Sequence, residues 1–256
     1  QQGKTMNYTS VINKAADAGY KVIVLLAGTQ SSLRDQTQDR LDDGFIGISR
    51  NEAVGIKPTK VGVGNVITQD PQPETVAHTF TKGGDLSKLA SVAQVNVEEK
   101  PHIFVIKKNV NILQNLINSF KSLNLQTALD DRIGSKVSLP LLMIDDEADN
   151  ASVNTRNEED ATAINRKIRE FLNLFERKCF VGYTATPFAN IFINHESESE
   201  MLGHDLFPSH FITVLGIPSN YQGPESLFPP YEEPNYKIRE ILDNEAVLPI
   251  NHKKFH

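Results

Sequence analysis

The sequence predicts an α/β fold, a mostly parallel sheet with helices on both faces. Short apolar runs recur along the chain, stripes of apolar residues at helical spacing lie between them, and a polar segment follows each run. Continuous apolar runs are typical of strands that are covered on both faces. Because strands that alternate with helices build parallel sheets, this order predicts the fold class.

The first part of the pattern contains two strands, each followed by a helix. Residues 21–27, with the sequence KVIVLLA, form the first expected strand. Residues 32–35 resemble a capping box, which would open a helix that ends at about Leu41. Residues 103–106 form the second strand, and the apolar positions within 113–120 mark one face of an amphipathic helix.

The pattern continues with a third and a fourth strand. Residues 141–145 and 179–183 are the strands, and the apolar positions within 164–175 form a helical stripe between them. Prolines and glycines interrupt the stretch of about 46–100, so we expect an insertion there, with a short helix near 85–93.

Two regions follow from this organisation. Residues 1–195 hold the alternating strands and helices, so we expect one lobe there. Residues 196–256 are rich in proline and show no convincing helical stripe before Tyr236. We therefore expect an irregular C-terminal extension over 196–256.

The composition is that of a soluble globular protein, with 39% hydrophobic and 23% charged residues. The net charge of −6 argues against a protein that coats nucleic acid non-specifically, because such proteins are usually basic. No apolar run has the length of a membrane span, and the first residues lack a signal-peptide pattern. The single cysteine excludes an internal disulfide, so we expect a cytoplasmic protein without a membrane partner.

Polar segments follow all four expected strands. They are Gly28-Thr29, the run Lys107-Lys108-Asn109, the acidic cluster Asp145-Asp146-Glu147-Ala148-Asp149, and Thr184-Ala185-Thr186. Ligands of parallel α/β sheets bind at the carboxyl ends of the strands. We therefore expect these four segments to converge on one edge of the sheet.

Gly3-Lys4-Thr5 has the form of the end of a phosphate-binding loop, G-x-x-x-x-G-K-[ST]. The first glycine of that pattern would fall before residue 1. We therefore expect the chain to be an excised part of a longer protein that lacks the strand before the loop.

The two motifs together predict a nucleotide site with bound magnesium. Lys4 would reach the β and γ phosphates, and the amides of Gly3, Lys4 and Thr5 would open a helix whose N-terminus attracts anions. Thr5 and Asp146 would hold the magnesium ion, and Glu147 would orient and polarise the attacking water. The alternative is an acid-rich solvated turn together with a chance helix start.

The hydroxyls of the threonine motif, Thr184-Ala185-Thr186, are expected to form hydrogen bonds with the acidic cluster. Asp149 is spaced to reach Thr184 and Thr186, whose hydroxyls would couple the state of the nucleotide to the rest of the protein. Pro187 behind them suits the first turn of a helix. The alternative is a capped turn from strand to helix, which does not exclude the coupling role.

A third set of residues is expected to grip a nucleic-acid backbone through hydroxyls, amides and cations. The alternative for these residues is simple exposure to solvent, which for the lysines is about as good an interpretation. The set comprises Gly28, Thr29, Arg34, Gln36, Lys107, Lys108 and Asn109.

These motifs resemble motifs I, II and III of superfamily-two helicases, and so the RecA-like ATP-binding lobe of such motors. Longer segments, LAGTQSSLRDQTQDRLD, IDDEADNASVNT, VGYTATPFANIFI and GHDLFPSHFI, resemble the bacterial Z-one domain family, whose members are labelled as endonucleases. That family is associated with restriction-like and phage-defence gene clusters. The resemblance implies ATP-dependent work on DNA, with ATP and Mg²⁺ as cofactors and a nuclease or methyltransferase as a possible partner.

The leading hypothesis is therefore the ATP-hydrolysing lobe of a helicase-like DNA translocase. Helicases of this type complete the ATP site with an arginine from a second RecA-like lobe, for which the sequence shows no motif, so we expect that lobe outside this chain. One alternative is an endonuclease that cleaves DNA with a metal ion. Another is a regulatory nucleotide-sensing module without motor activity.

Overall fold

The computed structural model describes residues 3–49, 59–66, 78–79, 81, 100–127, 136–150, 152, 160–191, 198–199, 203–204 and 206–216. Gly3–Leu215 form one compact unit, and Gly216 begins a second unit of which no other residue is described. The predicted boundary near residue 195 stays a prediction.

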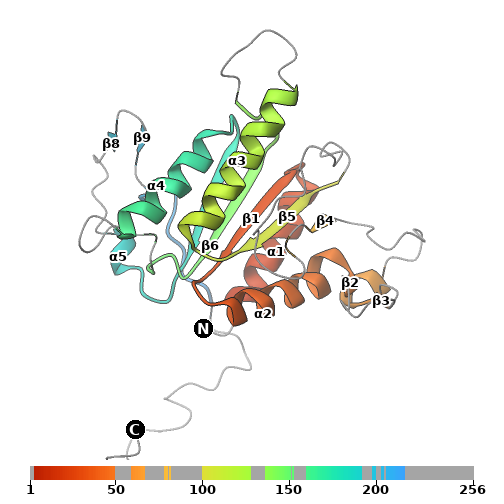
Figure 1. Cartoon of the computed structure of the whole chain (residues 1–256). Helices are drawn as coiled ribbons and strands as arrows, with labels where there is room; N and C mark the ends of the chain where they lie inside the picture. The colour runs from red at the N-terminus through yellow and green to blue at the C-terminus, as the bar shows by residue number, and fades with distance from the viewer. Residues whose placement is uncertain are drawn as a thin grey trace, which may run out of the picture. The chain divides into compact units, whose positions relative to one another are not determined.

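A five-stranded sheet forms the centre of the compact unit (Figure 1). All its neighbouring strands run parallel, which confirms the predicted α/β class and the parallel sheet. The four predicted strands are present. In spatial order the strands are β4 (His78–Thr79), β5 (His102–Ile106), β1 (Val22–Ala27), β6 (Leu141–Asp146) and β7 (Lys178–Tyr183).

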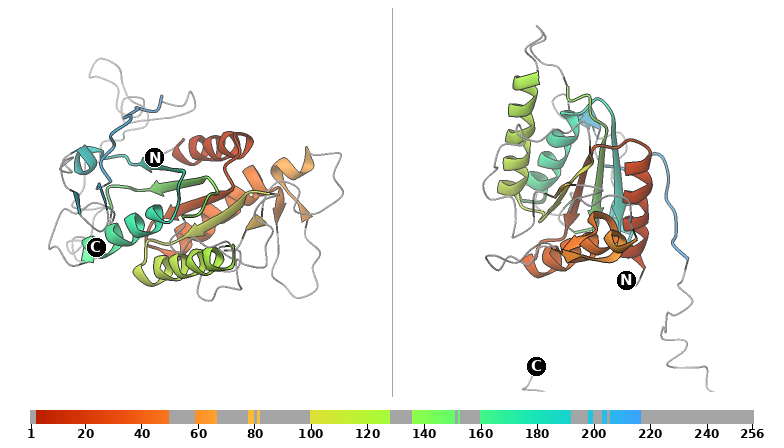
Figure 2. Two further views of the ribbon diagram at one scale, coloured as in Figure 1. Left: turned by 90° about the horizontal axis from the view of Figure 1, so that it is seen from above. Right: turned by 90° about the vertical axis from the view of Figure 1, so that its right-hand side faces the viewer.

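Helices cover both faces of the sheet, as predicted. On one face pack α1 (Lys4–Asp17) and the end of α2 (Ser31–Leu41), together with a π-helix over Asp42–Ile46. On the other face pack α3 (Val110–Thr127) and α4 (Asp160–Asn173). Figure 2 shows α1 on one side of the sheet and α3 and α4 on the opposite side.

Alternate residues of each strand point to opposite faces. In β6, Leu141 and Met143 belong to the core under α3 and α4, whereas Leu142 and Ile144 belong to the core under α1. This alternation continues past Ile144. It places Asp145 on the α3–α4 face and Asp146 on the α1 face, so two adjacent carboxylates enter different environments.

The helices predicted after the first three strands are confirmed as α2, α3 and α4, but their starts differ from the prediction. The prediction of a capping box at residues 32–35 is wrong. Gln30 is the N-cap of α2, and no side-chain hydrogen bond caps the helix, so Ser32 already lies within the first turn. At α3, Asn109 Oδ1 accepts hydrogen bonds from the amides of Asn111 and Ile112, at 2.9 and 3.3 Å, and caps the helix.

The stretch predicted as an insertion contributes β4 to the core sheet, and the sequence does not predict this strand. Two residues are too short for a strand to show a period of alternation. In the same stretch β2 (Ile48–Ser49) and β3 (Thr59–Lys60) pair antiparallel, followed by a 3₁₀ helix over Gly62–Asn65. The helix predicted near 85–93 lies outside the described residues.

After β7 the described elements are short. They are α5 (Phe188–Ile191) and an antiparallel pair of β8 (Glu198–Ser199) and β9 (Gly203–His204). Residues 206–216 contain no regular element. Within the described part of the chain, no helix is both long and apolar enough to cross a bilayer.

Candidate active site

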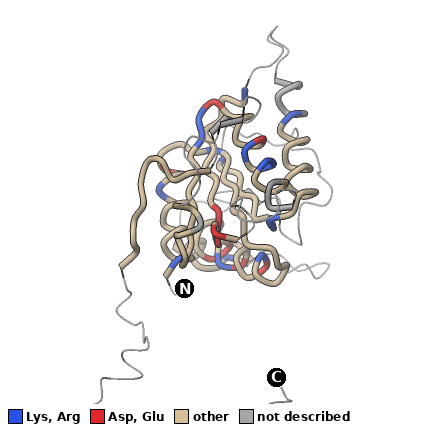
Figure 3. The backbone as a smooth tube through the Cα atoms, turned by 90° about the vertical axis from the view of Figure 1, so that its left-hand side faces the viewer, with Lys and Arg blue, Asp and Glu red and all other residues tan. Residues whose placement is uncertain are grey.

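The acidic cluster, the start of α1 and the segments after β1, β5 and β7 lie at the carboxyl edge of the sheet. In Figure 3, red and blue segments meet close to the chain end marked N, so acidic and basic residues lie side by side in this region. The sheet topology brings the segments together, because the carboxyl ends of parallel strands share one edge.

Lys4 and Asp146 form the first contact of the site. Lys4 Nζ lies 3.3 Å from Asp146 Oδ1, and the two side chains are 12% and 21% exposed. Gly3 is the N-cap of α1 with a φ of 101°, a conformation that glycine adopts without strain. No side-chain hydrogen bond from the N-cap occupies the first-turn amides of this helix, which have no partner within the helix and can bind an anion.

The chemistry of these residues fits a nucleotide with magnesium. A half-buried ammonium and a helix N-terminus suit phosphate oxygens. A carboxylate and a hydroxyl suit Mg²⁺, which keeps several waters and takes its other ligands from phosphates. Among the residues that the structure describes, no three or more His, Cys, Asp or Glu side chains group as a metal site by themselves.

Thr5 makes a contact that the sequence did not predict. Arg40 Nη1, on α2, donates a hydrogen bond to Thr5 Oγ1 at 3.1 Å. Arg40 lies 35 positions away in the sequence, and no motif connects the two residues. Packing of α2 beside α1 brings a second cation, the exposed Arg40, to the edge of the site.

Asp145, the first residue of the acidic cluster, is fully buried together with Lys108. Lys108 Nζ lies 2.6 Å from Asp145 Oδ1, and the two groups form an ion pair. Burial raises the pKa of Asp145 to about 6, although the nearby Lys108 and Ser152 oppose that rise. Asp145 was not among the predicted site residues, but strand alternation placed it with Leu141 and Met143 on a buried face.

Glu147 occupies a strained turn directly behind β6. Its φ of 60° is the only positive value of a non-glycine residue in the described ranges. Such a conformation costs on the order of 1–3 kcal/mol and persists only where its surroundings hold it. The carbonyl of Glu147 accepts hydrogen bonds from Lys108 Nζ at 2.5 Å and from the amide of Asn150 at 2.8 Å.

Gly28 lies beside the carboxylate of Glu147. It is buried with a φ of 69°, and a Cβ built there would come within 3.6 Å of Glu147 Oε2. The Gly28 carbonyl also accepts a hydrogen bond from the main-chain amide of Lys108 at 2.8 Å. The ends of β1, β5 and β6 therefore meet at Glu147.

Asp149 contacts the threonine motif, as the spacing predicted. Thr184 Oγ1 donates to Asp149 Oδ1 at 2.6 Å, and Thr186 Oγ1 donates to Asp149 Oδ2. Burial would raise the pKa of Asp149, but the two hydroxyls outweigh it and hold that pKa below its ordinary value. The carboxylate thus joins the end of β6 to the end of β7. The coupling role stays a prediction.

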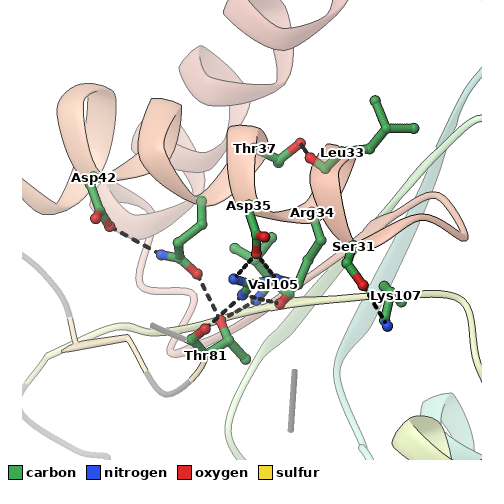
Figure 4. A network of polar contacts seen from close by, with 10 residues as sticks. Ser31, Leu33, Arg34, Asp35, Thr37, Asp42, Thr81, Val105 and Lys107 are labelled. Carbon is green, nitrogen blue, oxygen red and sulfur yellow. Dashed lines mark hydrogen bonds and ion pairs between the residues drawn. The ribbon is translucent and has the colours of Figure 1, made fainter. Parts of the chain in front are cut away.

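Two cations expected to contact nucleic acid are buried, which corrects the expectation of accessible charges. The Lys108 side chain is fully buried, so the alternative of solvent exposure is wrong as well. Arg34 is 4% exposed, and its Nη1 donates to the carbonyl of Thr81 at 2.6 Å (Figure 4). Both side chains contact protein oxygens at buried positions.

The other members of that set lie nearer the surface. Thr29, Gln36 and Asn109 are exposed, whereas Lys107 is half-buried and Gly28 is buried. Lys107 Nζ donates a hydrogen bond to Ser31 Oγ at 3.0 Å (Figure 4). Asn109 caps α3, which gives it a structural role beside any contact with a ligand.

The site thus consists of two charged pairs on opposite faces of the sheet, with Glu147 between them and Asp149 bonded to the next strand. Lys4 and Asp146 form the accessible pair, and Lys108 and Asp145 form the buried one. Comparisons with protein-family models, with curated proteins and with solved structures find no match for this chain.

Proposed function

We propose that this chain is the ATP-binding and ATP-hydrolysing lobe of a helicase-like DNA translocase of the Z-one domain type. On this proposal it works in a bacterial restriction or phage-defence system. The contact between Lys4 and Asp146 carries the proposal, because it joins a cation at a helix N-terminus to a carboxylate at a strand end. Motors that hydrolyse nucleotides use these two groups at these two places.

The residues divide the work of phosphoryl transfer between them. Lys4 and the first-turn amides of α1 bind and orient the phosphates. Thr5 and Asp146 hold magnesium, which when bound offsets the negative charge of the phosphates. Glu147 orients the attacking water and accepts its proton.

Asp149 connects the turn that carries Glu147 to the threonine motif behind β7. Its carboxylate bonds Thr184 and Thr186, which precede α5. A change at the Glu147 turn therefore reaches the segment behind β7 through two hydrogen bonds. On the proposal, this path carries the state of the nucleotide to the rest of the motor.

The DNA backbone would be contacted by the accessible residues after β1 and β5. Thr29 and Lys107 offer a hydroxyl and an ammonium, and exposed Asn109 offers an amide, all groups that bind phosphates without reading sequence. Arg34 and Lys108 are left out of this contact because their charged groups are buried.

Replacing Glu147 tests the proposal. The variant Glu147→Gln keeps the shape of the side chain but removes its basicity, so DNA-stimulated ATP turnover should fall about 100-fold or more. Binding of a fluorescent ATP analogue should persist, since the phosphate-binding groups remain. The matched control is Glu176→Gln, an exposed glutamate at the other end of the fold, which should turn over ATP normally.

If the Glu147→Gln variant hydrolyses ATP at the wild-type rate, the motor assignment is wrong. ATP turnover that DNA never stimulates would point to a regulatory nucleotide-sensing module. DNA cleavage that needs Asp146 and a metal ion but no ATP would point to an endonuclease.

A further inference from the structure

Lys108 lies two residues beyond the end of β5, and its ammonium contacts three oxygens of the acidic cluster and its turn. Its Nζ lies 2.6 Å from Asp145 Oδ1, 2.5 Å from the Glu147 carbonyl and 2.9 Å from the Asn150 carbonyl. No part of the side chain is exposed. One buried cation therefore holds both the start and the end of the turn that carries Glu147.

The ion pair alone does not account for this arrangement. Burying an ammonium is costly unless a counter-ion and further acceptors satisfy it. Asp145 supplies the counter-ion, whereas the two carbonyls come from residues 147 and 150. Because Glu147 has a positive φ that its surroundings must hold, these carbonyl contacts act directly on its backbone.

Lys108 also fixes the loop that faces the Glu147 carboxylate. Its main-chain amide donates to the carbonyl of Gly28 at 2.8 Å. A Cβ at Gly28 would lie 3.6 Å from Glu147 Oε2, so this glycine bounds the space of the carboxylate. The same residue thus sets the backbone of Glu147 and one wall beside its side chain.

We infer that Lys108 is a positioning residue for Glu147. This rests on the proposed function, in which Glu147 orients the attacking water. Lys108 is buried and acts only through Glu147, so it should affect the rate of the chemical step more than the binding of nucleotide. Misplacing a catalytic group by about 1 Å costs on the order of 100-fold in rate.

The test uses a variant that keeps the fold. Lys108→Met alone leaves the Asp145 carboxylate buried without its counter-ion, which is strongly destabilising. The double variant Lys108→Met/Asp145→Asn removes both charges, retains similar volumes and still loses the two contacts to the carbonyls. The matched control is Lys121→Met on α3, where the lysine is 50% exposed and pairs with Glu170.

In steady-state hydrolysis of Mg–ATP, the double variant should show a kcat about 10- to 100-fold below wild type and a KM within about twofold. Circular dichroism should give a folded spectrum, and Lys121→Met should match wild type. If Glu147→Gln abolishes turnover but the double variant keeps a kcat within twofold of wild type, the inference is overturned. A proportional rise of KM without a fall in kcat would overturn it too.

Hydrogen–deuterium exchange tests the same idea without hydrolysis. The Asn150 amide bonds the Glu147 carbonyl, so its protection reports the turn. Peptides that cover residues 145–150 should exchange faster in the double variant, while peptides from β1 and α3 stay unchanged. Wild-type protection of 145–150 would overturn the role of Lys108 even in a protein without turnover. A different outcome is that wild type shows no ATP turnover that depends on Glu147, while residues 145–150 still exchange faster in the double variant. That outcome would refute the proposed function but not the role of Lys108 in holding the turn.

Discussion

Asp145 and Asp146 are neighbours in the sequence that have separate roles because a strand sends them to opposite faces. Asp145 is fully buried with Lys108, whereas Asp146 is 21% exposed and lies near Lys4. Burial raises the pKa of Asp145 to about 6, which marks an environment that opposes its charge. On the proposed function, the accessible carboxylate of Asp146 is the one that would hold magnesium.

The two aspartates should therefore respond differently to replacement by asparagine. Asp145→Asn leaves the Lys108 ammonium buried without a counter-ion and should lower the free energy of unfolding by about 3–5 kcal/mol. Asp146→Asn should leave that free energy nearly unchanged but weaken magnesium-dependent binding of ATP. Urea denaturation and titration of a fluorescent ATP analogue measure the two effects. If Asp146→Asn lowered the stability and Asp145→Asn weakened ATP binding, the roles assigned to the two aspartates would be wrong.

Asp149 gives a prediction about pH. The hydroxyls of Thr184 and Thr186 hold its pKa below the ordinary value of 3.8. The stabilisation from this carboxylate is therefore present above about pH 4 and is lost as the pH falls through the lowered pKa. In Thr184→Val/Thr186→Val the pKa of Asp149 should rise, and stability at pH 7 should fall by about 1 kcal/mol, since the carboxylate is partly open to solvent.

Carboxyl-detected NMR titration measures the pKa of Asp149, and urea denaturation at pH 7 measures the stability. Ser119→Ala removes a hydroxyl that bonds the Asn115 carbonyl on α3, away from Asp149, so it serves as a control that leaves the pKa of Asp149 unchanged. An unshifted titration in the double threonine variant would mean that the two hydroxyls do not govern this carboxylate.

At the scale of elements, helix α2 shows why the sequence could not reveal its buried face. Its buried residues are Arg34, Thr37, Gln38 and Leu41, at helical spacing but mostly polar. A search for apolar stripes passes over such a face. Thr37 and Gln38 also bond groups four positions away within the helix region, but Arg34 and Gln38 contact Thr81, more than 40 positions away, which only tertiary packing shows (Figure 4).

Thr81 is the centre of that network. Its hydroxyl donates to Gln38 Oε1 at 2.8 Å and accepts from the amide of Val105 at 2.9 Å. Thr81→Val leaves a buried amide and a buried carbonyl oxygen without these partners, so stability should fall by about 2–4 kcal/mol. Urea denaturation measures the free energy of unfolding, and the control is Thr59→Val, which replaces an exposed threonine. Equal stability of the two variants would contradict a structural role for the network.

At the scale of the whole molecule, the long elements and one contact between them could be predicted, whereas two other contacts of the site could not. Apolar runs gave the four long strands, but β4 is too short to show a pattern. Motif spacing predicted that Asp149 meets the threonines, because both segments end parallel strands. The contact between Arg40 and Thr5 follows from the packing of two helices, and the contact between Lys108 and Asp145 follows from the register of two strands. No local motif encodes either contact.

On the proposed function, DNA would be contacted at the edge of the sheet where Thr29 and Lys107 follow the neighbouring strands β1 and β5. A lysine that meets a phosphate contributes by releasing counter-ions, so its loss weakens binding equally for all sequences. Lys107→Ala should therefore reduce DNA affinity uniformly and lower the slope of log affinity against log salt by about 1. Fluorescence anisotropy with two unrelated duplexes at several salt concentrations measures both. Lys121→Ala, which removes an equal charge on α3, controls for the change in net charge. An unchanged slope in Lys107→Ala would place the DNA contact on another surface of the protein.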